Sequence, residues 1–316
     1  MTLTDFGLCA EAFQQTSIPD EVANLNAQMA QMSKAMPDIT ELGVERARQG
    51  GFMPKAPRCP DGIDREIGNG VSVRIIPVAS PAAVYLHIHG GGLILGSADG
   101  QDPMLMQIAN GANVTCVSVE YRLTPDHPYP AAWDDCAAAA LWLIENAKAE
   151  FGTDRVLIGG ESAGALLSVT TLTRLRDRHD YTGIGAAALS FGVYDTSMTP
   201  SQRAAKSGLL TAKSIAWIAN CYAPDKTKQR DPEFSPLYAD LAGLPPALFT
   251  VGTADALLDD TLFMHARWLA AGNQAELAIY PGADHAFIGM PHPQAPFALQ
   301  RIARFLASHR SDGGEQ

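Results

Sequence analysis

The sequence predicts an α/β fold with a mostly parallel sheet flanked by helices on both faces. Short apolar runs typical of buried strands alternate with segments of ten or more residues that suit helices. The chain has 316 residues, 47% of them hydrophobic, and can therefore bury a large core. Polar motifs directly follow several apolar runs, and in parallel sheets sites form at the carboxyl ends of the strands.

Residues 1–50 differ from the rest and predict two helices. A helix-start signal at residues 17–20 precedes apolar residues spaced by three and four. These apolar residues are Val22, Leu25, Met29, Met32 and Met36. The stripe predicts a helix packed on the main core, or a lid whose flexible methionines line a pocket, and the two interpretations are compatible. Pro37 ends the stripe, and residues 39–48 could form a second short helix.

From about residue 63 the chain alternates between strands and helices. Strands are expected at 71–76, 83–88, 114–119, 155–159, 186–191, 247–251 and 275–281. Helices are expected at 105–112 and 131–148, from the turn after 159 to near 178, and at 259–272 and 295–309. Residues 200–235 interrupt this alternation, and 209–223 contain a plausible helix. An insertion there could meet the N-terminal helices as a cap.

Charge and cysteine usage restrict the partners and the compartment. The net charge of −11 argues against nucleic acid or an anionic membrane as a partner. Five scattered cysteines without metal-finger spacing fit free thiols in a reducing compartment. The first basic residue is Lys34, so the N-terminus lacks the positive region of a signal peptide. We therefore expect a cytoplasmic protein.

The stretch Gly160-Glu161-Ser162-Ala163-Gly164 predicts a serine at the apex of a sharp turn between a strand and a helix. Gly160 and Gly164 are small, as they must be if strand and helix are not to collide. The free N–H groups at the start of the helix favour developing negative charge near Ser162. Alone, such a pattern is common in loops, so other motifs must support a catalytic interpretation.

A second motif, His89-Gly90-Gly91-Gly92, directly follows a predicted strand. Its three glycines let the backbone approach a ligand closely and turn N–H groups inward. Such donors suit the oxyanion that forms during acyl transfer. His87 and His89 could also suggest a metal, but no third ligand is evident and a packed strand residue is favoured for His87, so no metal site is predicted.

Two further motifs supply an acid and a base. Asp255 comes just past a predicted strand and could orient a histidine, whereas Asp259 and Asp260 suit the first turn of the next helix. His285 follows another strand and is a natural general base near neutral pH. The chain order Ser162, Asp255, His285 is that of α/β-hydrolases.

In combination these motifs resemble the hormone-sensitive-lipase-like family of carboxylesterases, the bacterial group marked by an HGGG motif. The resemblance covers roughly residues 60–310. It is carried by the HGGG stretch at 89–92, the loop 121–130, the turn 160–164, residues 235–237 and 243–246, residues 255–260 and His285.

The resemblance implies an α/β-hydrolase fold with a helical cap. The cap would comprise residues 1–50 and an insertion at about 200–225 within a catalytic domain of residues 51–316. It further implies Ser162 as nucleophile, Asp255 as acid and His285 as base.

The same resemblance implies oxyanion donors on Gly91, Gly92 and Ala163 and no metal or organic cofactor. Two positions differ from the family pattern. Glu161 stands where the family usually has Asp, and Ala165 where it often has Gly. Neither position belongs to the triad.

The expected function is hydrolysis of short- to medium-chain acyl esters through an acyl-enzyme intermediate, with a small-molecule ester as the partner. Hydrolysis of amides, carbamates or lactones would use the same triad and stays open. A non-catalytic small-molecule binding protein is a remote alternative, against which the presence of His285 speaks. A lipase acting at membranes is disfavoured by the acidic charge. The family resemblance also suggests a homodimer through an edge strand.

Overall fold

The structure, a computed structural model, describes residues 8–33, 38–51 and 56–310. Within these residues one sheet of eight strands has the order β1-β2-β4-β3-β5-β6-β7-β8. The strands are β1 Ile63–Glu66, β2 Ser72–Ile76, β3 Ala83–Ile88, β4 Val114–Glu120, β5 Val156–Glu161, β6 Ala187–Ser190, β7 Ala247–Gly252 and β8 Ala275–Tyr280. Within this sheet β2 alone points opposite to the other strands, which confirms the mostly parallel sheet.

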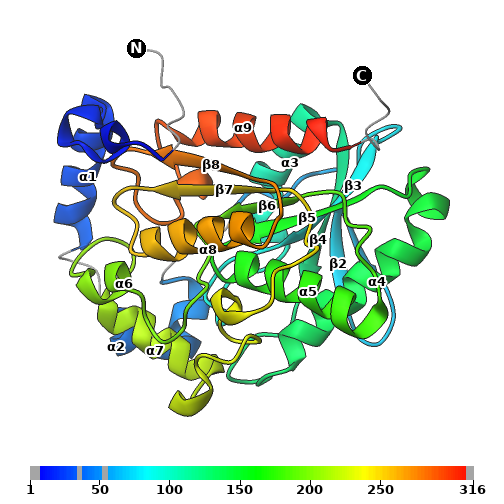
Figure 1. Cartoon of the computed structure of the whole chain (residues 1–316), viewed down its shortest axis with the longest axis horizontal. Coiled ribbons are helices and arrows are strands. Elements are labelled where there is room, and N and C mark those ends of the chain that lie inside the picture. Colours follow the sequence, from blue (N-terminus) through cyan, green and yellow to red (C-terminus); the bar gives the residue numbers. More distant parts are fainter. Residues whose placement is uncertain (1–7, 34–37, 52–55, 311–316) are drawn as a thin grey trace.

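Helices cover both faces of the sheet and bury a separate apolar core on each. Figure 1 shows α3 and α9 on one side and α4, α5 and α8 on the other. Their bounds are α3 Asp102–Ala112, α4 Ala131–Phe151, α5 Ala163–His179, α8 Leu258–Ala270 and α9 Ala295–Ser308. The central strands are buried on both sides, which explains their nearly continuous apolar sequences. No helix in the described part of the chain is long and apolar enough to span a membrane.

The seven predicted strands are present, and the structure adds an eighth. Strand β1 reads Ile-Asp-Arg-Glu and lies mostly exposed at the sheet edge. Because three consecutive residues of β1 are charged, its sequence does not form an apolar run. It pairs antiparallel with β2 and extends the sheet beyond the strands that carry motifs.

The remaining helices gather at one end of the molecule, at the left of Figure 1. They are α1 Asp20–Ser33, α2 Ile39–Arg46, α6 Pro200–Ala204 and α7 Ala212–Tyr222, and a π-helical turn, η3, follows α2 at Ala47–Gly51. Short 3₁₀ turns complete the described elements at Ala10–Phe13, Gln15–Ser17, Asp99–Gln101, Lys226–Lys228, Pro236–Tyr238 and Phe287–Gly289. Helices α2 and α7 share a small apolar cluster with Ile94 and Leu95, which follow the HGGG stretch.

The apolar stripe predicted for the first helix is only half buried. Val22 is fully buried, but Met29 and Met32 are 42% and 61% exposed. Met36 lies outside the described residues. Core packing does not describe Met29 and Met32, so that prediction is wrong for the second half of α1, whereas the lining of a pocket by these methionines stays a prediction. Periodicity identifies a helix but not what lies opposite each of its turns.

The first half of α1 is fixed to the loop that precedes His285. The side chain of Val22 lies against Gly282, and the Asn26 amide donates a hydrogen bond of 2.8 Å to the Gly282 carbonyl. Gly282 has φ 78° and no room for a side chain on this side. An N-terminal helix therefore contacts a loop more than 250 residues away in sequence.

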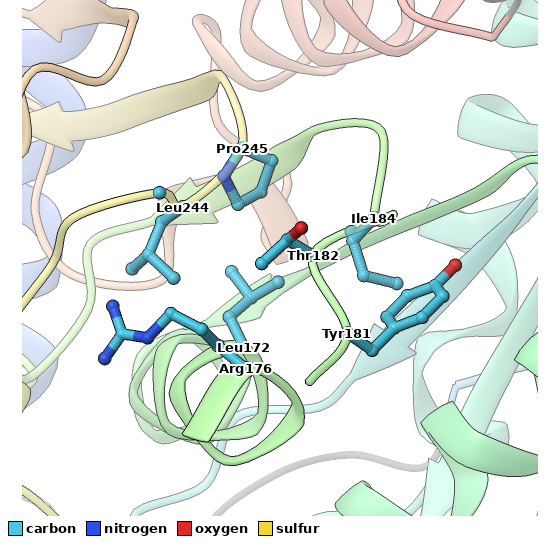
Figure 2. A pocket seen from close by; sticks show the side chains of 8 residues that line it. Leu172, Arg176, Tyr181, Thr182, Ile184, Leu244 and Pro245 are labelled. Carbon is cyan, nitrogen blue, oxygen red and sulfur yellow. The ribbon is translucent and has the colours of Figure 1, made fainter. Parts of the chain in front are cut away.

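A small surface pocket of about 10 Å³ lies far from the HGGG stretch. Figure 2 shows its lining, which includes Leu172 and Arg176 on α5, Ile184 before β6 and Pro245 before β7. It therefore sits at the amino ends of these strands. Leu172 is also about 15 Å along α5 from Ser162, at 1.5 Å per residue. This space holds one water molecule at most and plays no part in the site described below.

The two glycines of the serine turn allow three backbone segments to meet. A β-carbon on Gly160 or on Gly164 would overlap the Ile88 carbonyl oxygen at the end of β3. From the sequence, we expected the strand and the helix of the turn to crowd each other. The structure shows that the crowding partner is mainly the neighbouring strand, which leads into the HGGG stretch.

We expect Gly164→Ala to lower the free energy of unfolding by about 1–3 kcal/mol, as overpacking of other protein interiors does. The clash is with backbone, so β3 itself would have to shift. Urea unfolding followed by circular dichroism measures the effect. Gly289→Ala is the matched control, because no heavy atom lies within 4 Å of its added β-carbon. Equal stability of Gly164→Ala and the wild type would contradict the packing argument.

Candidate active site

Ser162 occupies a strained backbone position between β5 and α5. Its φ of 55° and ψ of −118° are unusual for a residue with a side chain. Its N–H donates a hydrogen bond of 2.9 Å to the Ser190 carbonyl at the end of β6. Such strain persists only where surrounding structure enforces it, and it is common at functional sites. The geometry presents the Ser162 hydroxyl at the carboxyl edge of the sheet.

The structure brings Ser162, His285 and Asp255 into one hydrogen-bonded chain. His285 Nε2 lies 3.0 Å from Ser162 Oγ, and His285 Nδ1 lies 3.0 and 3.1 Å from the two Asp255 carboxylate oxygens. His285 and Asp255 are almost completely buried. Asp255 also accepts a hydrogen bond of 2.8 Å from the Leu257 N–H, which fixes its side chain.

The surroundings of His285 set its basicity. Burial alone would lower the pKa of His285, but the charge and hydrogen bonds of Asp255 outweigh it. Asp284 and Asp260 add negative charge, so the net pKa of His285 is raised. The Phe191 ring packs edge-on against the imidazole, with ring centroids 5.0 Å apart. The Phe191 ring therefore restricts the position of the imidazole in addition to the hydrogen bonds of His285.

Asp259 and Asp260 lie in the first turn of α8, as predicted, and neither bonds to His285. Asp259 accepts a hydrogen bond of 2.8 Å from the Ser201 N–H. Asp260 is fully buried, and it accepts hydrogen bonds from Tyr194 N, Asp195 N, Thr199 Oγ1 and Gln202 Nε2. Burial nevertheless raises the pKa of Asp260 to about 7. Both carboxylates hold the segment after β6.

The HGGG stretch forms a loop whose N–H groups are available. Gly91 and Gly92 have φ of 113° and 63°, which side chains rarely permit. A β-carbon on Gly91 would also overlap the Leu95 carbonyl. In the described ranges, no backbone hydrogen bond uses the N–H of Gly91, Gly92 or Ala163. These donors can therefore bind an anionic oxygen without breaking existing bonds.

The loop after β4 holds the HGGG stretch and the residue after it through hydrogen bonds and ring stacking. The Tyr121 hydroxyl donates to the His89 carbonyl at 2.9 Å, and its ring stacks on the His89 imidazole at 4.2 Å. Thr124 donates through its N–H and its hydroxyl to the Leu93 carbonyl, at 2.8 and 3.1 Å. No chemical role for the loop 121–130 was predicted from the sequence. Tyr121 and Thr124 donate to backbone carbonyls, and because every residue has such a carbonyl, these bonds leave no signal in the sequence.

Burial also determines the state of His89. It lowers the pKa of His89 to about 4, so the ring is neutral at pH 7. His89 Nδ1 lies 2.7 Å from the Gly90 carbonyl, to which a neutral ring with its proton on Nδ1 donates. His89 thus stiffens the loop that contains it.

Residues from both predicted cap regions contact the HGGG stretch or the segments next to it. Arg48, in η3, donates hydrogen bonds of 2.8 Å to the carbonyls of Ile94 and Thr124 and pairs with Asp126. Ile218, on α7, lies so close to Gly92 that a methyl carbon would be 2.8 Å from an added β-carbon. Neither Arg48 nor Ile218 stands in a motif that would identify it from the sequence.

We expect the imidazole pKa of His285 to lie above its usual 6.5 and to fall in Asp255→Asn. The substitution removes the negative charge but leaves the burial that disfavours the cation. NMR titration of ¹⁵N-histidine-labelled protein measures both values. Asp259→Asn is the matched control and should leave the pKa of His285 nearly unchanged. An unaltered pKa in Asp255→Asn would show that Asp255 does not control this group.

Comparison with known proteins agrees with this geometry. A family described by the alpha/beta hydrolase fold matches residues 85–289. The chain is 32% identical over 289 residues to the carboxylic ester hydrolase LipN of Mycobacterium tuberculosis, covering 87% of this chain and 72% of LipN. It is 33% identical over 254 residues to the ethyl acetate hydrolase of Pseudomonas putida, covering 77% and 80%.

Among solved structures, a hormone-sensitive lipase from a metagenome library superposes with a TM-score of 0.83 at 26% identity. The match covers 93% of this chain and 100% of that one. The resemblance and the fold predicted from the motifs are confirmed. The chain belongs to the α/β-hydrolase family, in the hormone-sensitive-lipase-like group of carboxylesterases that its motifs predict.

Proposed function

We propose that the protein is a serine carboxylesterase that hydrolyses short- to medium-chain acyl esters. The observation that carries the proposal is the 3.0 Å separation between Ser162 Oγ and His285 Nε2, with Asp255 bonded to the other ring nitrogen. A nucleophile within hydrogen-bond reach of a base that a third group orients is the arrangement that acyl transfer requires.

In the proposed acylation step, His285 Nε2 accepts the Ser162 hydroxyl proton as the serine oxygen attacks the acyl carbon. The imidazolium that forms faces the buried Asp255 carboxylate, which stabilises its charge. The same proton then passes to the leaving alcohol as the carbon–oxygen ester bond breaks. Water next gives a proton to His285, attacks the acyl-enzyme and releases the acid, and the proton returns to Ser162.

Negative charge develops on the acyl oxygen in both steps. The available N–H groups of Gly91, Gly92 and Ala163 support the proposal that they bind this oxyanion. Ala163 begins α5, so the helix dipole acts in the same direction. Losing one such donor typically reduces turnover by about 10²–10³.

We base the size of the proposed substrate on the apolar side chains that lie beside Gly92 and the HGGG stretch. We propose that residues 1–50 and about 200–225 act as a cap, with Ile218 narrowing the space next to Gly92. The apolar cluster of α2, α7 and the loop after the HGGG stretch suits an apolar substrate of modest length. The relationship to an ethyl acetate hydrolase agrees with a short acyl group.

We expect an alkyl p-nitrophenyl phosphonate to form one covalent adduct, on Ser162. The phosphorus resembles the tetrahedral intermediate and traps the serine that the base has activated. Peptide mapping by mass spectrometry locates the adduct. Ser162→Ala should show neither labelling nor ester hydrolysis, whereas Ser168→Ala, which alters a serine within α5, should still be labelled. An unlabelled Ser162 in folded wild-type protein would remove the basis of the proposal.

We expect Ile218→Ala to shift the preferred acyl chain towards longer p-nitrophenyl esters, in a series from acetate to decanoate. Removal of the side chain opens space beside Gly92. The measured quantity is kcat/KM across the series, with matched anilides and lactones alongside. Ile144→Ala, a half-buried isoleucine on α4, is the control and should keep the wild-type preference. An unchanged preference in Ile218→Ala would exclude this residue from the pocket wall, and faster anilide or lactone hydrolysis would change the substrate class.

A further inference from the structure

Three polar side chains form a buried chain across neighbouring strands beneath the serine turn. His87 on β3 lies 2.9 Å from Ser118 on β4 through Nδ1 and 2.9 Å from Glu161 on β5 through Nε2. His87 pairs in register with Ser118 on one side and with Gly159 on the other. Glu161 is two residues beyond Gly159, so all three side chains project from the same face of the sheet.

Both ring nitrogens of His87 have a hydrogen-bond partner in this buried chain. His87 and Ser118 are fully buried, and the Glu161 side chain is 13% exposed. Because a carboxylate only accepts, His87 Nε2–H donates a hydrogen bond to Glu161, and Nδ1 of the ring in its neutral form accepts a hydrogen bond from the Ser118 hydroxyl. Each buried atom of the imidazole that can bond has a partner, as a low-dielectric interior demands.

The chain joins the two parts of the site at the point where they leave the sheet. Glu161 immediately precedes Ser162, and His87 lies two residues before His89, where the HGGG stretch begins. The Glu161 carbonyl is also in close contact with Gly90, since an added β-carbon there would be 2.9 Å from it. A shift of Glu161 would therefore move Ser162 relative to the loop that carries Gly91 and Gly92.

We propose that Glu161, held by His87 and Ser118, is a positioning residue that fixes Ser162 relative to the oxyanion donors. This inference rests on the proposed esterase function and assigns it a part beyond the triad. The role is geometric: the side chain must have the length of glutamate and offer an acceptor oxygen. Misplacement of reacting groups by about 1 Å can reduce rates by about 10².

The length requirement separates positioning from a simple charge effect. Glu161→Gln keeps both the length and an acceptor oxygen for His87, but removes the charge. Glu161→Asp keeps the charge but cannot reach His87 at the same backbone position. Positioning predicts that Gln retains activity and Asp loses it, whereas a role for negative charge beside Ser162 predicts the reverse.

The test measures kcat, KM and the rate of Ser162 phosphonylation in the full-length variants, together with their melting temperatures. We expect Glu161→Gln to stay within about threefold of wild-type kcat, and Glu161→Asp, Glu161→Ala and His87→Ala to fall by about 10–100-fold with little change in KM. Phosphonylation should slow in parallel, because it depends on the same alignment. The losses of kcat in Glu161→Ala and His87→Ala should not add in the double variant, because each substitution removes the same contact between the two side chains.

Glu233→Ala is the matched control. Glu233 is a half-buried carboxylate, 2.9 Å from the buried Arg174, and it lies outside the site. We expect it to lower the melting temperature while kcat stays at the wild-type value. If Glu161→Ala behaved like this control, with lower stability and unchanged kcat, the positioning role would be overturned.

Other outcomes are equally decisive. Retained activity in Glu161→Asp together with loss in Glu161→Gln would replace positioning with an electrostatic role. If the alanine variants do not fold, the comparison of Gln with Asp still decides. Failure of wild-type Ser162 to react with the phosphonate would overturn the proposed esterase function itself, whereas labelled wild type with equally reactive variants would overturn only the role of Glu161.

Discussion

The carbonyl oxygen of Ile88 lies so close to Gly160 and Gly164 that neither can carry a side chain. This contact sets the distance between β3 and the serine turn, and almost everything at the site depends on it. The HGGG stretch begins one residue after Ile88, and Ser162 lies between the two glycines. A single close approach of backbones thus places the candidate nucleophile beside three N–H groups that have no other backbone partner among the described residues.

Loops from distant parts of the chain then stabilise this edge of the sheet through backbone acceptors. Tyr121 and Thr124 hold the HGGG loop from the β4 side, and Arg48 ties it to the N-terminal segment. The loop that carries His285 is fixed by α1 through Gly282. Few of these contacts touch a chemically reactive atom. They preorganise the donors and the base, which is how fixed dipoles stabilise developing charge without rearrangement.

The parts that sequence could predict are those that leave a local pattern. Central strands such as β4 are apolar on both faces, and glycines flanking Ser162 mark the turn, so both were predicted. Strand β1 was missed because its charged residues suit an exposed edge. The burial of Met29 and Met32 was predicted wrongly because helical periodicity says nothing about what lies opposite. The pairing of Glu161 with His87 depends on β3 lying between β4 and β5, an order that no local pattern encodes.

A crystal structure of the phosphonate adduct would show whether the contact between β3 and the serine turn builds a working oxyanion site. We expect phosphorus bonded to Ser162 Oγ, with one phosphoryl oxygen about 2.7–3.1 Å from the N–H nitrogens of Gly91, Gly92 and Ala163. His285 Nε2 should remain within hydrogen-bond distance of Ser162 Oγ. A phosphoryl oxygen directed into solvent, away from these three nitrogens, would contradict the claim.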